Sequence, residues 1–160
     1  MDFSKITDYL YIGTTPYTED YPALFEMGVG LVINMRIERP PHRLHPATPI
    51  RVLWLPSFDS PLIPISVRFL RKGVRAALET IREGNGVYTH CAAGIHRSAA
   101  LGASILIGLG YSLEESLNLV KQRRHISDPY TWYIRRRIEH FSRVWDYPAK
   151  GYSGVTRYPS

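Results

Sequence analysis

The residues best suited to chemistry lie in the segment HCAAGIHRS, residues 90–98, which contains the single cysteine of the chain. Arg97 follows Cys91 by six positions, and its planar guanidinium can bind two phosphate oxygens at once. The preceding GVYTH has the character of a strand, and the following residues are apolar all round, as in a buried helix. A tight turn between a strand and a helix N-terminus directs backbone N–H groups into one concavity, where the helix dipole adds positive potential. The segment therefore predicts an anion-binding loop with a cysteine at its floor.

The predicted loop would also activate its cysteine. A thiol beside a helix N-terminus and a cation has a pKa of roughly 3.5 to 7.5, so that it is a thiolate at neutral pH. A thiolate beneath a bound phosphorus can attack in line and form a thiophosphoryl intermediate, which water then hydrolyses. Gly94 permits the positive φ or the close backbone approach that such a turn needs. The predicted substrate-binding residues are Ala92, Ala93, Gly94, Ile95, His96 and Arg97.

The spacing His-Cys-x5-Arg-Ser resembles the signature of the cysteine-based protein tyrosine phosphatase superfamily, most closely its small dual-specificity branch. LYIG near the start, VIN at residues 32–34 and VKQRRHISDP also resemble stretches of that branch. The resemblance covers roughly residues 9–145. It implies an enzyme that hydrolyses phosphotyrosine and phosphoserine or phosphothreonine in proteins, with no metal ion or other cofactor.

The resemblance also implies a role for each matching residue of the signature. Cys91 is the expected nucleophile, and Arg97 is expected to bind the phosphate. Ser98 is the expected hydroxyl that stabilises the thiolate when the intermediate breaks down. His90 is expected to support Cys91 from behind, although a His at such a position can also be an ordinary buried side chain.

The general acid is expected upstream of the signature. In this superfamily it is an Asp on a mobile loop some thirty residues before the cysteine, and Asp59 in PSFDSP lies 32 positions before Cys91. Asp59 could instead only cap the Asp-Ser-Pro turn. His96 occupies a variable signature position and is expected at the pocket rim or in solvent, where a substrate contact and a bystander role are both open.

Other functions fit parts of the same pattern. A zinc site of His90, Cys91 and His96 is disfavoured, because adjacent strand residues point to opposite faces. A phospho-binding module would be expected to lack the nucleophile or the acid, and a phosphoinositide phosphatase often carries Lys in the loop, which is absent here. RNA 5′-phosphatase activity is suggested by seven Arg and Lys residues from Lys121 to Arg143, which leaves nucleic acid open as a partner.

The composition is that of an ordinary globular protein. The chain has 160 residues, of which 44% are hydrophobic and 21% charged, and this length suits one domain. Its formal charge of +6 favours anionic ligands such as phosphoproteins, phospholipid headgroups or nucleic acid. No membrane-spanning apolar run or secretory signal is visible, so the cytoplasm is the predicted compartment. We expect a single catalytic domain over residues 1–146 and a flexible tail over residues 147–160.

The elements that must position the loop alternate between strands and helices. Strands are expected at residues 9–12, 31–35, 51–55 and 86–90. Helices are expected from Thr18 to Gly28 with Phe25 on the inner face, over 67–81 with Gly73 weakening it, over 98–109, from the Ser112 capping box, and from Asp128. Pro-rich loops are expected at 38–49 and 56–64. The predicted fold is α/β, a central mixed, mostly parallel sheet flanked by helices, with the phosphate-binding loop between a strand and a buried helix.

Overall fold

The computed structural model describes residues 1–41 and 49–146. Most of the predicted loop at residues 38–49 and the whole predicted tail at 147–160 lie outside this part of the chain, so both stay predictions. Within the described residues, no helix is both long and apolar enough to cross a bilayer.

The described strands form one sheet in the order β1-β2-β5-β3-β4. The strands are β1 (Phe3–Thr7), β2 (Leu10–Gly13), β3 (Val29–Arg36), β4 (Arg51–Ser57) and β5 (Gly86–His90). β1 pairs antiparallel with β2, whereas β5 runs parallel to both of its neighbours and β3 runs parallel to β4. The predicted mixed, mostly parallel sheet is confirmed. Because β5 is the central strand, the loop after it emerges at the carboxyl edge, where open α/β sheets bind ligands.

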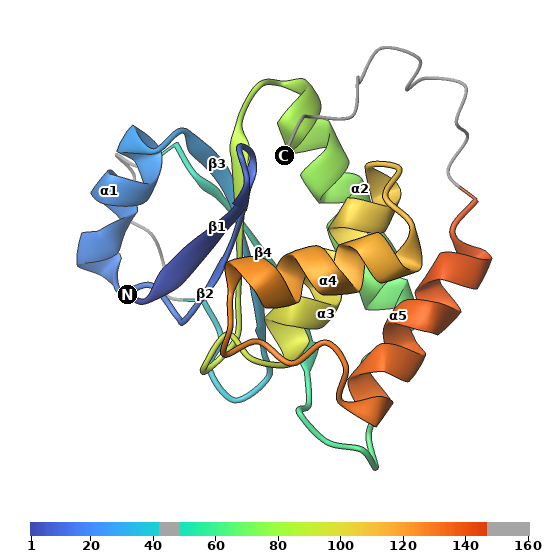
Figure 1. Cartoon of the computed structure of the whole chain (residues 1–160). Coiled ribbons are helices and arrows are strands. Elements are labelled where there is room, and N and C mark those ends of the chain that lie inside the picture. The colour runs from blue at the N-terminus through green and yellow to red at the C-terminus, as the bar shows by residue number, and fades with distance from the viewer. Residues whose placement is uncertain (42–48, 147–160) are drawn as a thin grey trace.

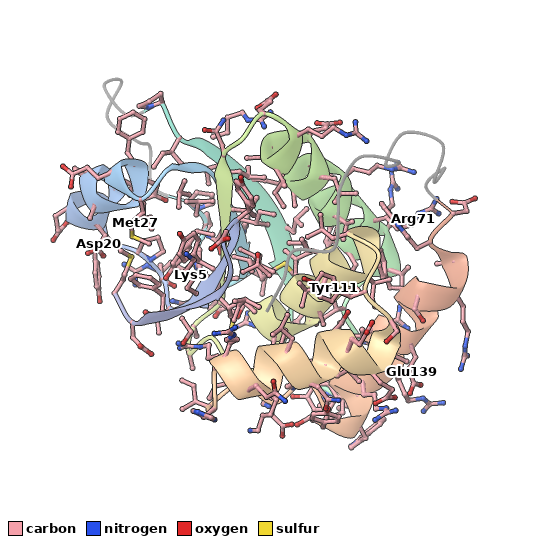
Figure 2. The ribbon with its side chains drawn as sticks, turned by 45° about the horizontal axis from the view of Figure 1, so that its top comes forward. Lys5, Asp20, Met27, Arg71, Tyr111 and Glu139 are labelled. Carbon is pink, nitrogen blue, oxygen red and sulfur yellow. The ribbon has the colours of Figure 1, made fainter. Side chains whose placement is uncertain are left out.

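Helices cover both faces of this sheet (Figure 1). The 3₁₀ turn η1 (Thr18–Asp20) and α1 (Tyr21–Glu26) lie on one face. The other face carries α2 (Val67–Arg82), α3 (Arg97–Gly108), α4 (Leu113–Arg123) and α5 (Trp132–Val144). In Figure 2, Asp20 and Met27 mark the α1 side, whereas Arg71 and Glu139 mark the helix-rich side. Side chains alternate along the strands, so that each face of the sheet has its own hydrophobic core.

α3 is the central helix of the larger layer, in contact with α2, α4 and α5 as well as with β2 and β5. Its residues from Arg97 to Leu106 are all buried, which confirms the prediction made from its apolar composition. Gly73 of α2 faces it, and a Cβ at this position would lie 2.7 Å from Cδ1 of Leu101. Gly73 therefore permits the close approach of α2 and α3. The sequence predicted only that this glycine weakens the helix, and not that it has a packing role.

Three local predictions differ from the structure. The strand β1 is not among the predicted elements, because FSKIT has no clear alternation and is ordered by pairing with β2. α5 begins at Trp132 and not at Asp128, because the Asp128 carboxylate accepts hydrogen bonds from the backbone N–H groups of Tyr130 and Thr131 and stabilises a turn there. Phe25, predicted on the inner face of its helix, is 53% exposed.

Candidate active site

The predicted anion-binding loop, residues 91–96, joins the end of β5 at His90 to the start of α3 at Arg97. Gly94 has a φ of 70°, a left-handed conformation that L side chains rarely adopt. A Cβ at this position would also lie 2.9 Å from the backbone oxygen of Gly13. Glycine is therefore needed here for its conformation and for its small size.

Cys91 lies at the floor of the loop and is 2% exposed. Its Sγ is 3.3 Å from Oγ of Ser98, which lies in the first turn of α3. The hydroxyl of Thr15 donates a hydrogen bond of 3.2 Å to the backbone oxygen of Cys91 and holds the loop from the side of β2. A hydroxyl at this distance and the N-terminal end of a helix can both stabilise a negatively charged sulfur. The arrangement suits a thiolate nucleophile.

Arg97 is held in one orientation by Glu38. One terminal nitrogen of its guanidinium donates to Oε2 of Glu38 at 2.8 Å and the other to Oε1 at 3.0 Å. The first nitrogen also donates to the backbone oxygen of Ser57 at 3.0 Å. The buried Nε of Arg97 makes no hydrogen bond within the described residues. A planar fork held in this way is ready to donate to the oxygens of an anion in the loop.

Glu38 is a site residue that the sequence analysis did not find. The hydrogen bond from Arg97 lowers the pKa of Glu38 from its usual 4.5 to about 2, so the carboxylate stays charged at any ordinary assay pH. Glu38 lies in the stretch ERPP after β3 and is 59 residues from Arg97. An acidic residue in a predicted surface loop resembles any solvated Glu, so no local signal distinguishes it.

Asp59, His96 and Tyr133 meet at the rim of the loop, although they come from three separate segments. Nδ1 of His96 lies 3.1 Å from both carboxylate oxygens of Asp59. Tyr133, in the first turn of α5, donates a hydrogen bond of 2.7 Å to Oδ1 of the same carboxylate. The second oxygen, Oδ2, lies 4.0 Å from Nε of Arg97. Asp59 is thereby held beside the arginine that would bind phosphate.

These contacts concern two residues whose roles the sequence left open, and they add one residue. The Asp59 carboxylate contacts His96 and Tyr133, which lie outside its own turn. The His96 ring lies against the candidate acid, and the roles of both residues stay predictions. Burial, followed by the hydrogen bond to Asp59, raises the pKa of Tyr133 to about 12, so its hydroxyl remains a donor at neutral pH. Tyr133 was not predicted because it is 74 residues from Asp59.

A second buried arginine supports the loop from behind. Arg124, the residue after α4, is 3% exposed and donates to the carbonyl oxygens of Gly94 and Ala93 at 3.1 and 3.2 Å. Its guanidinium also donates to the carboxylate of Asp2 at 2.8 Å. The hydroxyl of Ser127 donates to the Gly94 carbonyl at 2.7 Å. Because the C=O and N–H of a peptide point in opposite directions, carbonyls drawn outward turn the N–H groups of the loop towards its concavity.

His90 is 2% exposed and lies behind Cys91. Burial lowers the pKa of His90 from its usual 6.5 to about 4, and the guanidinium groups of Arg36, Arg39 and Arg97 act in the same direction. The imidazole is therefore neutral at pH 7. Within residues 1–41 and 49–146, no three His, Cys, Asp or Glu side chains are grouped so that they could hold a metal ion.

The low pKa of His90 predicts a loss of stability in mild acid. The unfolded chain binds a proton at this residue below pH 6.5, whereas the folded chain does so only below about pH 4. The free energy of unfolding is therefore highest, as far as His90 is concerned, above pH 6.5. It falls by up to about 3 kcal/mol as the pH decreases towards 4. Urea unfolding at several pH values between 5 and 7 measures this slope, which should flatten in His90→Gln.

The exposed His125 offers a matched control, because His125→Gln should leave the slope of the unfolding free energy unchanged. An equal slope in His90→Gln and in the unsubstituted protein would show that His90 does not set the acid sensitivity.

Known phosphatases are similar to this chain over most of its length. The catalytic domain of the dual specificity phosphatases matches residues 10–143. Mouse dual specificity protein phosphatase 14 is 29% identical over 143 residues, which cover 88% of this chain and 70% of that protein. Mouse dual specificity protein phosphatase 2 is 29% identical over 130 residues, 78% of this chain, but the match covers only 38% of that longer protein.

A solved structure shares the fold. The crystal structure of human DUSP28 superposes with a TM-score of 0.78 at 22% identity and covers 88% of this chain and 93% of its own. At that identity the likeness concerns the fold alone. The match to the catalytic domain, which includes the whole loop from Cys91 to Arg97, shows that the chain belongs to the dual specificity phosphatase family.

Proposed function

We propose that this chain is a cysteine-dependent phosphatase that hydrolyses phosphotyrosine and phosphoserine or phosphothreonine in proteins. The observation that carries the proposal is the position of Cys91, 3.3 Å from the Ser98 hydroxyl at the floor of a loop whose rim is formed by Arg97. Family membership supports the same activity. The cytoplasm stays the predicted compartment.

In the first half of the reaction, the loop N–H groups and Arg97 bind three phosphate oxygens. The Cys91 thiolate attacks phosphorus, an S–P bond forms, and the bond from phosphorus to the leaving oxygen breaks. Asp59, in its protonated form, donates a proton to that oxygen. The contacts from His96 and Tyr133 would hold the Asp59 carboxyl group in position for this transfer.

In the second half, water attacks the phosphorus of the cysteinyl-phosphate intermediate. The Asp59 carboxylate accepts the proton of that water, the S–P bond breaks, and inorganic phosphate leaves with its new oxygen. The sulfur departs as a thiolate, which the Ser98 hydroxyl stabilises by a hydrogen bond. His90 is assigned a supporting role behind the nucleophile, because it is buried and neutral.

A panel of substrates tests the proposal. Peptides that carry phosphotyrosine, phosphoserine or phosphothreonine, soluble phosphoinositides and 5′-phosphorylated RNA should be compared at equal concentration by phosphate release. We expect turnover of the phosphopeptides. Turnover restricted to the phosphoinositides or to the RNA would contradict the assignment of a protein substrate.

Asp59→Asn should slow the enzyme according to the leaving group. Phosphotyrosine and alkyl phosphates have basic leaving oxygens, so their kcat should fall by about 10²-fold or more without a proton donor. An aryl phosphate with an acidic phenol needs less protonation and should be slowed much less. The high-pH limb of the rate profile, which reflects the need for a protonated Asp59, should disappear.

Asp8→Asn provides a matched control, since Asp8 is an exposed residue that pairs with Lys5 at the far end of β2. It should leave all substrates unaffected. Equal slowing of every leaving group in Asp59→Asn, with the high-pH limb unchanged, would mean that the acid lies elsewhere.

A further inference from the structure

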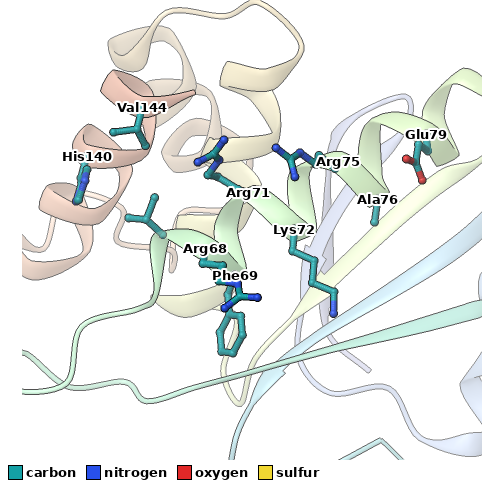
Figure 3. Close-up of a pocket in the computed structure, with 10 residues that line it drawn as sticks. Arg68, Phe69, Arg71, Lys72, Arg75, Ala76, Glu79, His140 and Val144 are labelled. Carbon is teal, nitrogen blue, oxygen red and sulfur yellow. The ribbon is translucent and has the colours of Figure 1, made fainter. Parts of the chain in front are cut away.

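Two hollows that share the lining residue His140 lie between the rim of the candidate active site and α2. The first has a volume of about 620 Å³ and lies between α5 and the loop that carries Asp59. The second, of about 1010 Å³, lies along α2 (Figure 3). His140 lines both hollows, and Tyr133, which contacts Asp59, lines the first. We name this feature the basic groove.

The basic groove concentrates the positive charge of the molecule. The lining of the first hollow includes Arg136, Arg137 and Arg143. The lining of the second includes Arg68, Arg71, Lys72 and Arg75. Among the described residues of the lining, these seven cations face two carboxylates, those of Glu79 and Glu139. These lining residues therefore have an excess of five positive charges, nearly as large as the formal charge of +6 of the whole chain.

Most of these cations have no partner of opposite charge in the part of the chain that the structure describes. Within residues 1–41 and 49–146, the ion pairs that involve the groove are those of Arg71 with Asp146 and of Glu139 with Arg135, which lies outside the groove. Arg68 and Lys72 are four residues apart on α2, as are Arg71 and Arg75, and Figure 3 shows Arg71 and Arg75 on the same side of the helix. Like charges at such spacings repel each other. An anionic ligand would relieve this repulsion.

We propose that the basic groove binds an acidic segment of the phosphoprotein substrate, next to the residue that is dephosphorylated. This proposal rests on the proposed function and names its substrate class more closely. α5 rises by about 16 Å from Tyr133 to Val144, so an extended peptide reaches its end with about five residues. Asp, Glu or further phosphorylated side chains within that reach would meet the guanidinium groups of α5 first and those of α2 beyond them.

The lining favours an acidic peptide over single-stranded nucleic acid. Proteins that bind single strands interleave cations with exposed aromatic rings on which successive bases stack. Here Trp132 is 60% exposed at the entrance, but Tyr133 is engaged with Asp59, and Phe69 packs against the core. One exposed ring at the entrance does not provide the series of stacking platforms that successive bases need, whereas the cations along the groove match carboxylate and phosphate side chains.

The test compares four substrates: an aryl phosphate, a phosphotyrosine peptide with neutral flanks, and two versions of that peptide with acidic residues before or after the phosphotyrosine. The unsubstituted enzyme should prefer one of the acidic peptides over the neutral peptide by about tenfold in kcat/KM, and added salt should reduce this preference. The double variants Arg136→Glu/Arg143→Glu and Lys72→Glu/Arg75→Glu should lose the preference through a higher KM. Their turnover of the aryl phosphate and the neutral peptide should be unchanged.

A matched control is Lys5→Glu/Arg123→Glu, which changes the net charge equally on β1 and α4, outside the groove. This variant should keep the preference for the acidic peptide. No preference in the unsubstituted enzyme, or an equal loss in this control, would overturn the groove proposal. A groove-dependent preference for 5′-phosphorylated RNA without one for acidic peptides would overturn it in favour of nucleic acid. Failure of the proposed function is distinct, because the neutral peptide would then not be hydrolysed at all.

Discussion

Cys91→Ser is expected to abolish turnover of aryl phosphates and phosphopeptides while the protein still binds tungstate. An alcohol is a far weaker nucleophile than a thiolate at neutral pH, so no phosphoryl intermediate can form. The oxyanion is held by backbone N–H groups and by Arg97, which Glu38 keeps in place independently of residue 91. Steady-state phosphate release measures the first effect, and calorimetric titration with tungstate measures the second.

Two controls accompany the Cys91→Ser experiment. Tungstate should inhibit the unsubstituted enzyme competitively, because it would fill the loop. EDTA should leave the rate unchanged, since no proposed step uses a metal ion. Activity of Cys91→Ser within about tenfold of the unsubstituted enzyme would refute nucleophilic catalysis by this residue, and loss of activity in EDTA that zinc restores would favour a metal site.

Arg97→Lys should lower kcat/KM by roughly two orders of magnitude or more, although the charge is kept. The planar fork of Arg97 donates to both carboxylate oxygens of Glu38 and also to the backbone oxygen of Ser57. A lysine ammonium cannot make these contacts and also bind two phosphate oxygens, which attract the cation more strongly as charge spreads in the transition state. Initial rates on an aryl phosphate measure the loss.

Arg51→Lys is a suitable comparison, because Arg51 is an exposed arginine at the opposite end of β4. It should have almost no effect on kcat/KM. An Arg97→Lys enzyme within about threefold of the unsubstituted rate would show that charge alone is sufficient.

The parts of the site that could be predicted are those encoded by neighbouring residues. Local patterns predict the strand, the turn with Gly94 and the helix that begins at Arg97, because these three elements follow each other directly in the sequence. Asp59 was located by its distance along the chain from Cys91, a spacing carried by the family resemblance. Its contacts with His96 and Tyr133 were beyond that reasoning.

The parts that could not be predicted depend on contacts between distant residues. Glu38 reaches Arg97 across 59 positions and Arg124 reaches Gly94 across 30. Glu38 and Arg124 each lie in a charged stretch of sequence that looks like ordinary solvated surface. Burial is predicted from the periodicity of apolar residues, so a buried charged residue gives no such signal. Only the folded arrangement shows that Arg124, at 3% exposure, is a buried residue and its neighbour Arg123 an exposed one.

The position of Arg124 couples the formation of the active-site loop to the docking of the amino terminus. This side chain joins the Gly94 carbonyl to Asp2 and also donates to the hydroxyl of Ser4. Its contacts with Asp2 and Ser4 span about three quarters of the chain. Contacts of such high sequence separation form late in folding, since the entropy of a large closed loop must first be overcome. A partly folded chain would therefore contain the signature residues without an ordered anion-binding loop. Removal of the first residues would loosen this loop from a distance, since the Arg124 guanidinium would lose the Asp2 carboxylate.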